Sequence, residues 1–140
     1  MKNIFIAFVL GLSSVGYSQT DYSFVYDSDS FLREGYNLYE EGKYQEAVKV
    51  FDKIVKNDPK FYSAQYEKAL ALAAGDDKEA AKAFYENAIN NGYAKEEPAF
   101  YMAYGSLLSD QKEYDKAEKM FLESLKIYPN SSTLFYNLAL

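Results

Sequence analysis

The chain has 140 residues, 49% of them hydrophobic and 18% aromatic, which is enough apolar side chain to bury the interior of one domain. Its formal net charge is −6, and no stretch concentrates basic residues, which argues against nucleic acid as a partner. Cysteine and histidine are both absent. Disulfides, thiolate nucleophiles, imidazole bases and most zinc or haem ligation are therefore excluded.

Residues 1–18 have the pattern of a secretory signal peptide. Lys2 gives a positive start, residues 4–12 are mostly apolar, and Gly16 and Ser18 are small residues at the positions that a signal peptidase reads. A membrane anchor is the alternative, but a nine-residue apolar run covers only about half of a ~30 Å hydrocarbon core. We expect cleavage before Gln19 and a mature chain without a transmembrane span, in the periplasm or outside the cell.

A short lead-in at residues 19–27 precedes a helical pattern that begins at Ser28 and continues to the end of the chain, with no strand pattern. In the second helix, apolar residues fall on one face: Tyr44, Ala47, Val48, Phe51, Ile54 and Val55. Asp58-Pro59 is expected to end this helix, because proline lacks an amide donor. Asn91-Gly92 is expected to end a later one through a left-handed glycine.

Two acidic motifs are read as helix starts. Asp110 and Glu113 have the spacing of a capping box. Asp27-x-Asp29 is similar to the opening of a calcium loop, but the glycine and the distal glutamate of such a loop are missing. Capping by Ser28 or Asp29 is therefore the favoured interpretation.

One set of residues recurs about every 34 positions. The steps between Phe31 and Pro59 are identical to those between Tyr101 and Pro129. Gly35 and Gly105 each cost a helix about 1 kcal/mol relative to alanine. We infer that a close approach of two helices offsets this cost.

This pattern resembles the tetratricopeptide repeat, a 34-residue helix-turn-helix unit. The resemblance implies an all-α, TPR-like alpha-alpha superhelix with repeats at 28–61, 62–97 and 98–131 and a partial fourth at 132–140. The second repeat departs from the pattern: Gln65 replaces a bulky residue, the terminal proline is missing and the unit is two residues longer. The residues expected to pack the repeats are Phe31, Gly35, Leu38, Ala47, Phe51, Pro59, Ala69, Ala81, Tyr85, Tyr101, Gly105, Leu108, Ala117, Phe121 and Pro129.

Two features depart from an ordinary array of this kind. Glu34 and Lys68 occupy the same position of neighbouring repeats, which is normally apolar. They either form an ion pair or extend their charged ends separately to water. The partial fourth repeat places Phe135, Leu138 and Ala139 at packing positions and then stops, so we expect either a truncated chain or an apolar end that docks onto something.

The resemblance also implies a concave groove, lined by the first helix of each repeat, that binds peptides. The expected partner-binding residues are Leu32, Tyr36, Tyr39, Tyr66, Leu70, Met102, Ser106 and Tyr136, with Ser63, Ala73, Ala99, Thr133 and Leu140 beside them. A basic clamp for a terminal carboxylate is not expected, because Leu32 and Tyr36 stand where that clamp has lysine and asparagine. Tyr36 and Tyr66 offer contact area and a hydroxyl for a ligand, or they pack only between repeats.

Taken together, these patterns predict an exported scaffold for protein–protein interaction with an aromatic and apolar groove and acidic rims that favour basic partners. A glycan- or small-ligand-binding envelope protein that uses the same tyrosines, or a structural spacer, are the alternatives. No nucleophile–base set is recognisable, so we expect neither catalysis nor a metal or cofactor.

Overall fold

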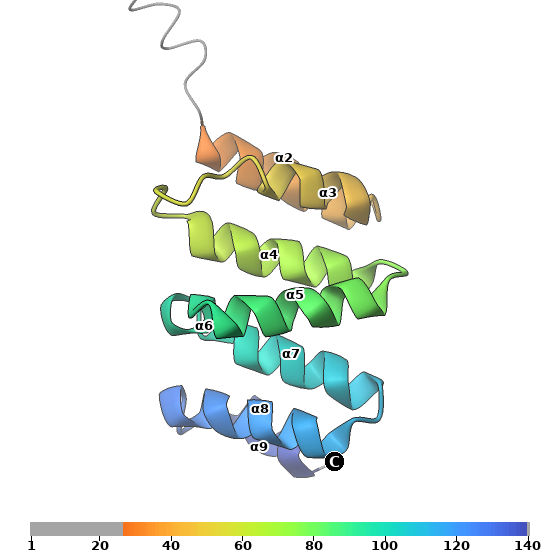
Figure 1. The fold of residues 1–140 in the computed structure, drawn as a ribbon, viewed down its shortest axis with the longest axis vertical. Helices are drawn as coiled ribbons and strands as arrows, with labels where there is room; N and C mark the ends of the chain where they lie inside the picture. Colours follow the sequence, from red (N-terminus) through yellow and green to blue (C-terminus); the bar gives the residue numbers. More distant parts are fainter. Residues whose placement is uncertain (1–26, 140) are drawn as a thin grey trace, which may run out of the picture.

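The structure is a computed structural model that describes residues 27–139, and the regular secondary structure in this part of the chain is all α-helix (Figure 1). Its helices are α2 (Ser28–Glu40), α3 (Tyr44–Phe51), α4 (Phe61–Ala74), α5 (Lys78–Asn90), α6 (Tyr93–Glu96), α7 (Ala99–Asp110), α8 (Tyr114–Ile127) and α9 (Ser132–Ala139). The predicted signal peptide, the lead-in before Asp27, and Leu140 lie outside the described residues. None of the described helices is long and apolar enough to cross a membrane.

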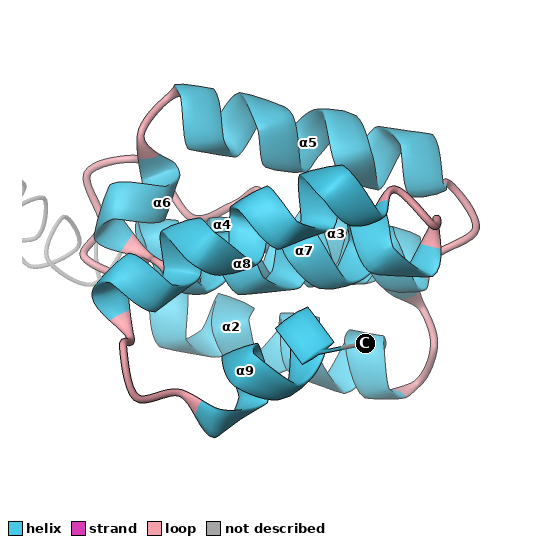
Figure 2. Cartoon of the chain, turned by 90° about the horizontal axis from the view of Figure 1, so that it is seen from below, coloured by secondary structure: helices cyan, strands magenta, loops and turns pink. Residues whose placement is uncertain are grey.

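The helices form antiparallel pairs, α2 with α3, α4 with α5 and α7 with α8, stacked along the long axis of the molecule (Figure 1). Seen along that axis, α5 lies on one side, α2 and α9 lie on the opposite side, and α3, α4, α7 and α8 lie between them (Figure 2). We call the first helices of the pairs, α2, α4 and α7, together with α9, the inner row, and the second helices α3, α5 and α8 the outer row. This arrangement confirms the predicted all-α solenoid.

Glycine allows the close approach of the two helices in the first and third pairs. A Cβ atom added at Gly35 would lie 2.4 Å from the Phe51 ring, and one added at Gly105 would lie 2.6 Å from the Phe121 ring. Both rings are almost fully buried. The predicted role of these glycines is therefore confirmed.

Most of the residues predicted to pack the repeats are buried. Ala47, Phe51, Ala69, Ala81, Tyr85, Leu108, Ala117 and Phe121 are almost inaccessible, Gly35 and Gly105 are buried, and Phe31, Leu38 and Tyr101 are half-buried. Pro59 and Pro129, in contrast, are exposed, so their assignment to packing was wrong. Their effect is on the backbone, where proline cannot continue a helix.

Helix α3 ends earlier than predicted. Its last residue is Phe51, and residues 52–60 form turns rather than a helix that continues to Asp58. The amide of Ile54 donates to the carbonyl of Phe51, three residues back, which tightens the chain into a turn. Ile54 is still buried at 2% exposure, whereas Val55 is 54% exposed and leaves the predicted apolar face.

The longer second repeat accommodates its extra residues at its end. Gly92 is left-handed, with φ +80°, and follows the last residues of α5 as predicted. The short helix α6 comes next, and Tyr93 packs edge-on against Phe61 and Phe100 at centroid distances of 5.6 and 6.5 Å. Helix α5 still contacts α7, so the stack continues past the irregular unit.

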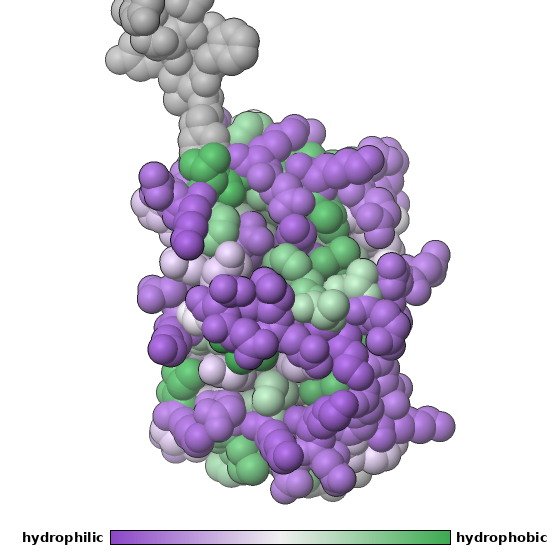
Figure 3. Space-filling model, viewed as in Figure 1, coloured by the Kyte–Doolittle hydropathy of each residue, from purple (hydrophilic) through white to green (hydrophobic). Residues whose placement is uncertain are grey.

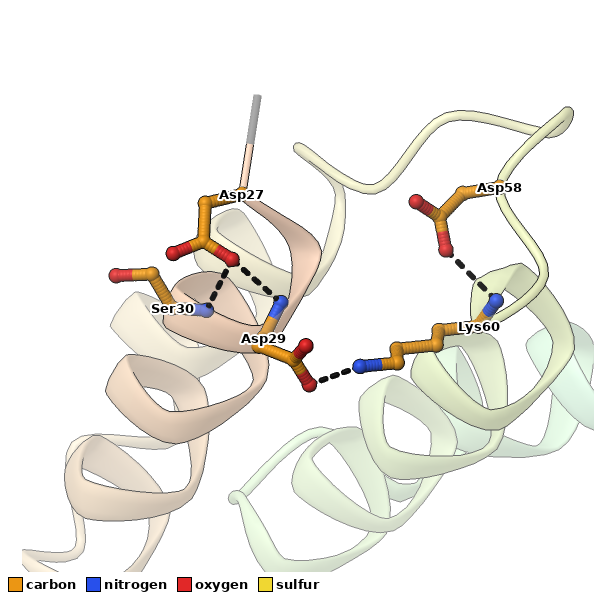
Figure 4. Close-up of polar contacts among 5 residues, drawn as sticks. All are labelled: Asp27, Asp29, Ser30, Asp58 and Lys60. Carbon is orange, nitrogen blue, oxygen red and sulfur yellow. Dashed lines mark hydrogen bonds and ion pairs between the residues drawn. The ribbon is translucent and has the colours of Figure 1, made fainter. Parts of the chain in front are cut away.

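Neither of the two predictions of acidic helix caps is correct. Asp27, not Ser28 or Asp29, caps α2, and its carboxylate accepts the amides of Asp29 and Ser30 at 3.1 and 3.2 Å (Figure 4). The Asp29 side chain instead forms an ion pair with Lys60, at the start of α4 (Figure 4).

The predicted capping box at Asp110 and Glu113 is also wrong. Asp110 is the last residue of α7, and α8 begins at Tyr114 after a tight turn in which Lys112 has a positive φ of 63°. The Glu113 side chain makes no capping bond and pairs with Lys82 and Lys116.

The proposed Glu34–Lys68 ion pair does not form. Lys68 Nζ lies 2.6 Å from Asp52 Oδ1, and Glu34 Oε2 lies 3.7 Å from Lys53 Nζ. Both partners come from the turn after α3, which supplies charges close to the seam.

Helix α9 buries a different residue from those expected. Leu134 packs against the preceding repeat at 1% exposure, whereas Phe135 is 55% exposed. Leu138 is half-buried. The stack therefore covers Leu134 and leaves the neighbouring Phe135 and Tyr136 of α9 exposed.

Candidate functional site

A hollow of about 420 Å³ opens on the inner row of helices, with walls from α2, α4, α5, α7 and α9. We call its lining the inner groove: Tyr39, Tyr66, Leu70, Ala73, Ala74, Lys78, Tyr85, Met102, Ala103, Ser106, Leu107, Asp110, Thr133 and Asn137. Most of these side chains are aromatic, aliphatic or small.

The two central walls of the inner groove follow from helical periodicity. On α4, Tyr66, Leu70 and Ala73 recur at steps of four and three residues, and on α7, Met102, Ser106 and Asp110 recur at steps of four. Such steps place side chains on one face of a helix. Because α4 and α7 are neighbouring first helices, their two faces meet in one hollow.

Five of the eight predicted partner-binding residues line the inner groove, namely Tyr39, Tyr66, Leu70, Met102 and Ser106. The other three lie elsewhere. Leu32 packs against the buried cluster of Ala47, Phe51 and Ala71, Tyr136 is strongly exposed, and Tyr36 lies beside the groove rather than in its lining. Among the additional residues, Ala73 and Thr133 line it, while Ser63 and Ala99 do not.

Tyr36 combines the two alternatives considered for it. Its ring packs edge-on against Phe51 at 6.0 Å, yet the residue remains 44% exposed. Its hydroxyl donates a hydrogen bond of 3.0 Å to Glu67 Oε1, on the next first helix. Partial burial and the negative charge of Glu67 raise the pKa of Tyr36 to about 12.

Glu67 and Glu97 give the inner row a negatively charged end. Glu67 lies one turn before Leu70 on α4, and Glu97 precedes α7. Ser63 Oγ donates to Glu97 Oε2 at 3.5 Å. Burial raises the pKa of the Glu67 carboxyl, and the nearby charge of Glu97 adds to this shift, while the bond from Tyr36 opposes it.

The negative charges of Glu67 and Glu97 also affect Tyr66, a residue of the inner groove. Burial is the main reason that the pKa of Tyr66 is raised, and both carboxylates raise it further. Tyr66 lines the groove, so the charged end and the apolar hollow are continuous.

The sequence patterns missed the polar members of this site. Glu67, Glu97 and Lys78 were not among the predicted partner-binding residues, and Asp110 was assigned to a capping box. The signal for Glu67 was present, because residues 63, 67 and 70 continue the same helical stripe as Tyr66. No group of three or more metal-ligating side chains occurs within the described part of the chain.

The outer face differs from the inner one. Hydrophilic side chains cover most of the surface seen in Figure 3, with smaller apolar patches between them. A hollow of about 340 Å³ lies between α5, α7 and α8, where the Tyr104 hydroxyl donates a 2.7 Å hydrogen bond to Glu86.

Comparison with known proteins agrees with the fold. Profiles described as tetratricopeptide repeat match residues 32–94 and 98–131. The chain is also similar to an Hsp70-Hsp90 organising protein of Plasmodium falciparum, with 33% identity over 104 residues that cover 71% of this chain and 39% of that protein. A protein of the same name from isolate 3D7 matches with the same identity, and 17% of its length is covered. The chain thus spans well under half of these relatives. The two profile matches and the stacked helix pairs place the chain in the tetratricopeptide repeat family.

Proposed function

We propose that this chain is an exported scaffold that binds a segment of a partner protein in the inner groove. The observation that carries the proposal is the hollow on the inner row, lined by Tyr66, Leu70 and Met102, which the side chains of the described residues leave open. Aromatic and thioether side chains provide contact area that adapts to an apolar ligand.

The relatives support a protein-binding role in general terms. Their names describe proteins that organise Hsp70 and Hsp90, and this chain matches only part of each. A clamp for a terminal carboxylate is not expected in this chain. Leu32 and Tyr36 stand where the sequence resemblance would require the lysine and asparagine of a carboxylate clamp.

Export is proposed from the pattern of residues 1–18. Expression of the full chain in a bacterial host should give a product in the periplasm or the medium whose N-terminal residue is Gln19. A product that stays in the cytosol with residues 1–18 intact would contradict export, and it would leave the groove proposal unaffected.

The groove proposal is tested by capture of a partner on wild-type protein and on matched variants. Leu70→Ala/Met102→Ala removes contact area from the inner groove, and Ser106→Arg fills it. Leu122→Ala is the control, because this leucine is apolar and exposed on the outer helix α8. Circular dichroism establishes that all variants fold.

We expect the groove variants to lose the captured partner and the control to keep it. Equal capture by all the variants would contradict the proposal and favour a spacer. Saturable binding on a glycan array that both groove substitutions abolish, without any captured protein, would favour the alternative of a glycan-binding protein, for which the tyrosines in the groove offer stacking surfaces.

A further inference from the structure

We propose that the inner groove selects partner segments in which a lysine or arginine lies two residues from an apolar residue. The cation binds between Glu67 and Glu97, and the apolar side chain enters the hollow beside Leu70. This inference rests on the proposed function of the groove and specifies the chemistry of the partner.

Ser63 links the two carboxylates, which come from different repeats: it lies one turn before Glu67 on α4, and its hydroxyl lies 3.5 Å from Glu97 Oε2. Glu67 belongs to α4 and accepts the Tyr36 hydroxyl, and Glu97 precedes α7 and accepts the Ser63 hydroxyl. The charge of Glu97 is felt at Glu67 and at Tyr66. Like charges at such proximity repel each other, and a cation placed between them relieves the repulsion.

No cation of the described residues pairs with either of these carboxylates. The nearest lysines along α4 and its flanks are engaged elsewhere: Lys60 pairs with Asp29, Lys68 with Asp52, and Lys78 donates to the carbonyl of Ala73. A half-buried carboxylate without a cation carries a desolvation penalty. A partner's ammonium or guanidinium group would therefore find acceptors that the fold itself leaves without a positive charge.

The spacing of the motif follows from helix and strand geometry. Glu67 and Leu70 are three residues apart on one face of α4, which corresponds to a separation of about 4.5 Å along the helix axis. In an extended peptide, side chains two residues apart point to the same side and lie about 6.6 Å apart. Given the reach of a long basic side chain, this spacing allows one extended segment to occupy both places at once.

The test begins with a library of random dodecapeptides displayed on phage, selected on the full chain at low salt. We expect enriched peptides to carry lysine or arginine two positions from an apolar residue. The best enriched peptide, made synthetically with a fluorescent label, is then titrated with the protein and followed by fluorescence polarisation. Glu67→Gln/Glu97→Gln should weaken binding at least about tenfold, and added salt should weaken wild-type binding in the same direction.

One matched control and one charge-reversal variant accompany the double variant. Glu46→Gln/Glu118→Gln removes the same number of charges from exposed positions on the outer helices α3 and α8, and it should leave binding unchanged. Glu97→Lys should reverse the preference, so that a peptide with glutamate in place of its basic residue binds better than the parent peptide. Because burial disfavours the charged form of Glu67, glutamine is well tolerated there, and circular dichroism verifies folding.

The outcomes separate this inference from the proposed function. Enriched peptides that are neutral or acidic but lose binding in Leu70→Ala/Met102→Ala would overturn the cationic motif and leave the groove intact. Basic peptides whose binding is weakened equally by both glutamine double variants would show nonspecific attraction and would also overturn it. If no enriched peptide responds to substitution in the groove, the cationic motif and the proposed function are both wrong.

Discussion

Alanine at position 35 or 105 is expected to destabilise this protein, although alanine favours a helix over glycine at an ordinary position. The reason is the nesting of each first helix against the ring of its second helix. At Gly35, a Cβ atom would lie 2.4, 2.6 and 2.9 Å from three atoms of the Phe51 ring. At Gly105, the corresponding distances to the Phe121 ring are 2.6, 2.7 and 3.1 Å.

The magnitude follows from two opposing terms. Replacement of glycine within a helix contributes about 1 kcal/mol in favour of alanine. Carbon atoms attract one another best at about 3.5–4.0 Å, so the Phe51 ring would have to retreat by about 1 Å. That ring is buried and is held on another side by Tyr36, and overpacking of this kind costs about 1–3 kcal/mol. We expect a net loss of about 1 kcal/mol, larger for Gly35→Ala than for Gly105→Ala.

Urea unfolding followed by circular dichroism measures this loss, and the chain contains its own control. The second repeat already has Ala69 at the equivalent position, fully buried, so Ala69→Gly should also destabilise, by about 1 kcal/mol through helix propensity. Gly105→Ala combined with Phe121→Leu should cost less than the sum of the two single changes, because the smaller side chain makes room. If Gly35→Ala and Gly105→Ala raise the unfolding free energy instead, the nested packing is wrong.

Four further outcomes are expected. Asp27→Ala should lower the free energy of unfolding by about 1 kcal/mol in urea titrations, because this side chain caps α2. Tyr104→Phe should cost about 1–2 kcal/mol, since its partly buried hydroxyl donates to a carboxylate, and an unchanged urea midpoint would contradict that bond. Leu134→Ala should cost about 2–5 kcal/mol while Phe135→Ala stays within about 0.5 kcal/mol, and thermal melts that rank them in the opposite order would exclude the observed docking of α9. The pKa of Glu67 is raised, so protonation of its carboxyl stabilises the folded state, and this stabilisation is lost as the pH rises above 4.5. Glu67→Gln should therefore become more stable relative to wild type as the pH rises from acidic to neutral, as measured by urea midpoints at each pH.

The parts of the fold that sequence could predict are those in which each residue's role is set by its own repeat. Gly35 meets Phe51 because both belong to one helix pair, and the pair recurs at Gly105 and Phe121. Spacing within a pair is fixed by helical geometry and turn length, so it is visible in the sequence. Helix ends were less predictable, because several acidic residues near Asp27 could serve as the cap and only one does.

The candidate site was predictable in its apolar part for the same reason. Tyr66, Leu70 and Met102 follow a helical stripe on first helices, and they line one hollow. The carboxylate of Glu67, in contrast, belongs to the site because it is partly buried, and burial cannot be read from the sequence. Glutamate is usually a surface residue, but the fold partly removes Glu67 from water and places the Tyr36 hydroxyl against its carboxylate.

The register between α2 and α4 explains why the predicted ion pair of Glu34 with Lys68 does not form and why Asp29 pairs with Lys60 instead. Asp29 meets Lys60, and Tyr36 meets Glu67, and in both contacts the partner is 31 residues further along the chain. The repeat is 34 residues long, so a side chain on α2 faces the residue nearly one helical turn before its equivalent on α4. Glu34 and Lys68 are equivalent positions, 34 residues apart, and this offset separates their charged ends. Tyr39 and Leu70 are also 31 residues apart, and both line the inner groove. The offset between α2 and α4 therefore relates two kinds of pair between these helices: the hydrogen bond of Tyr36 to the negatively charged Glu67, and the groove residues Tyr39 and Leu70.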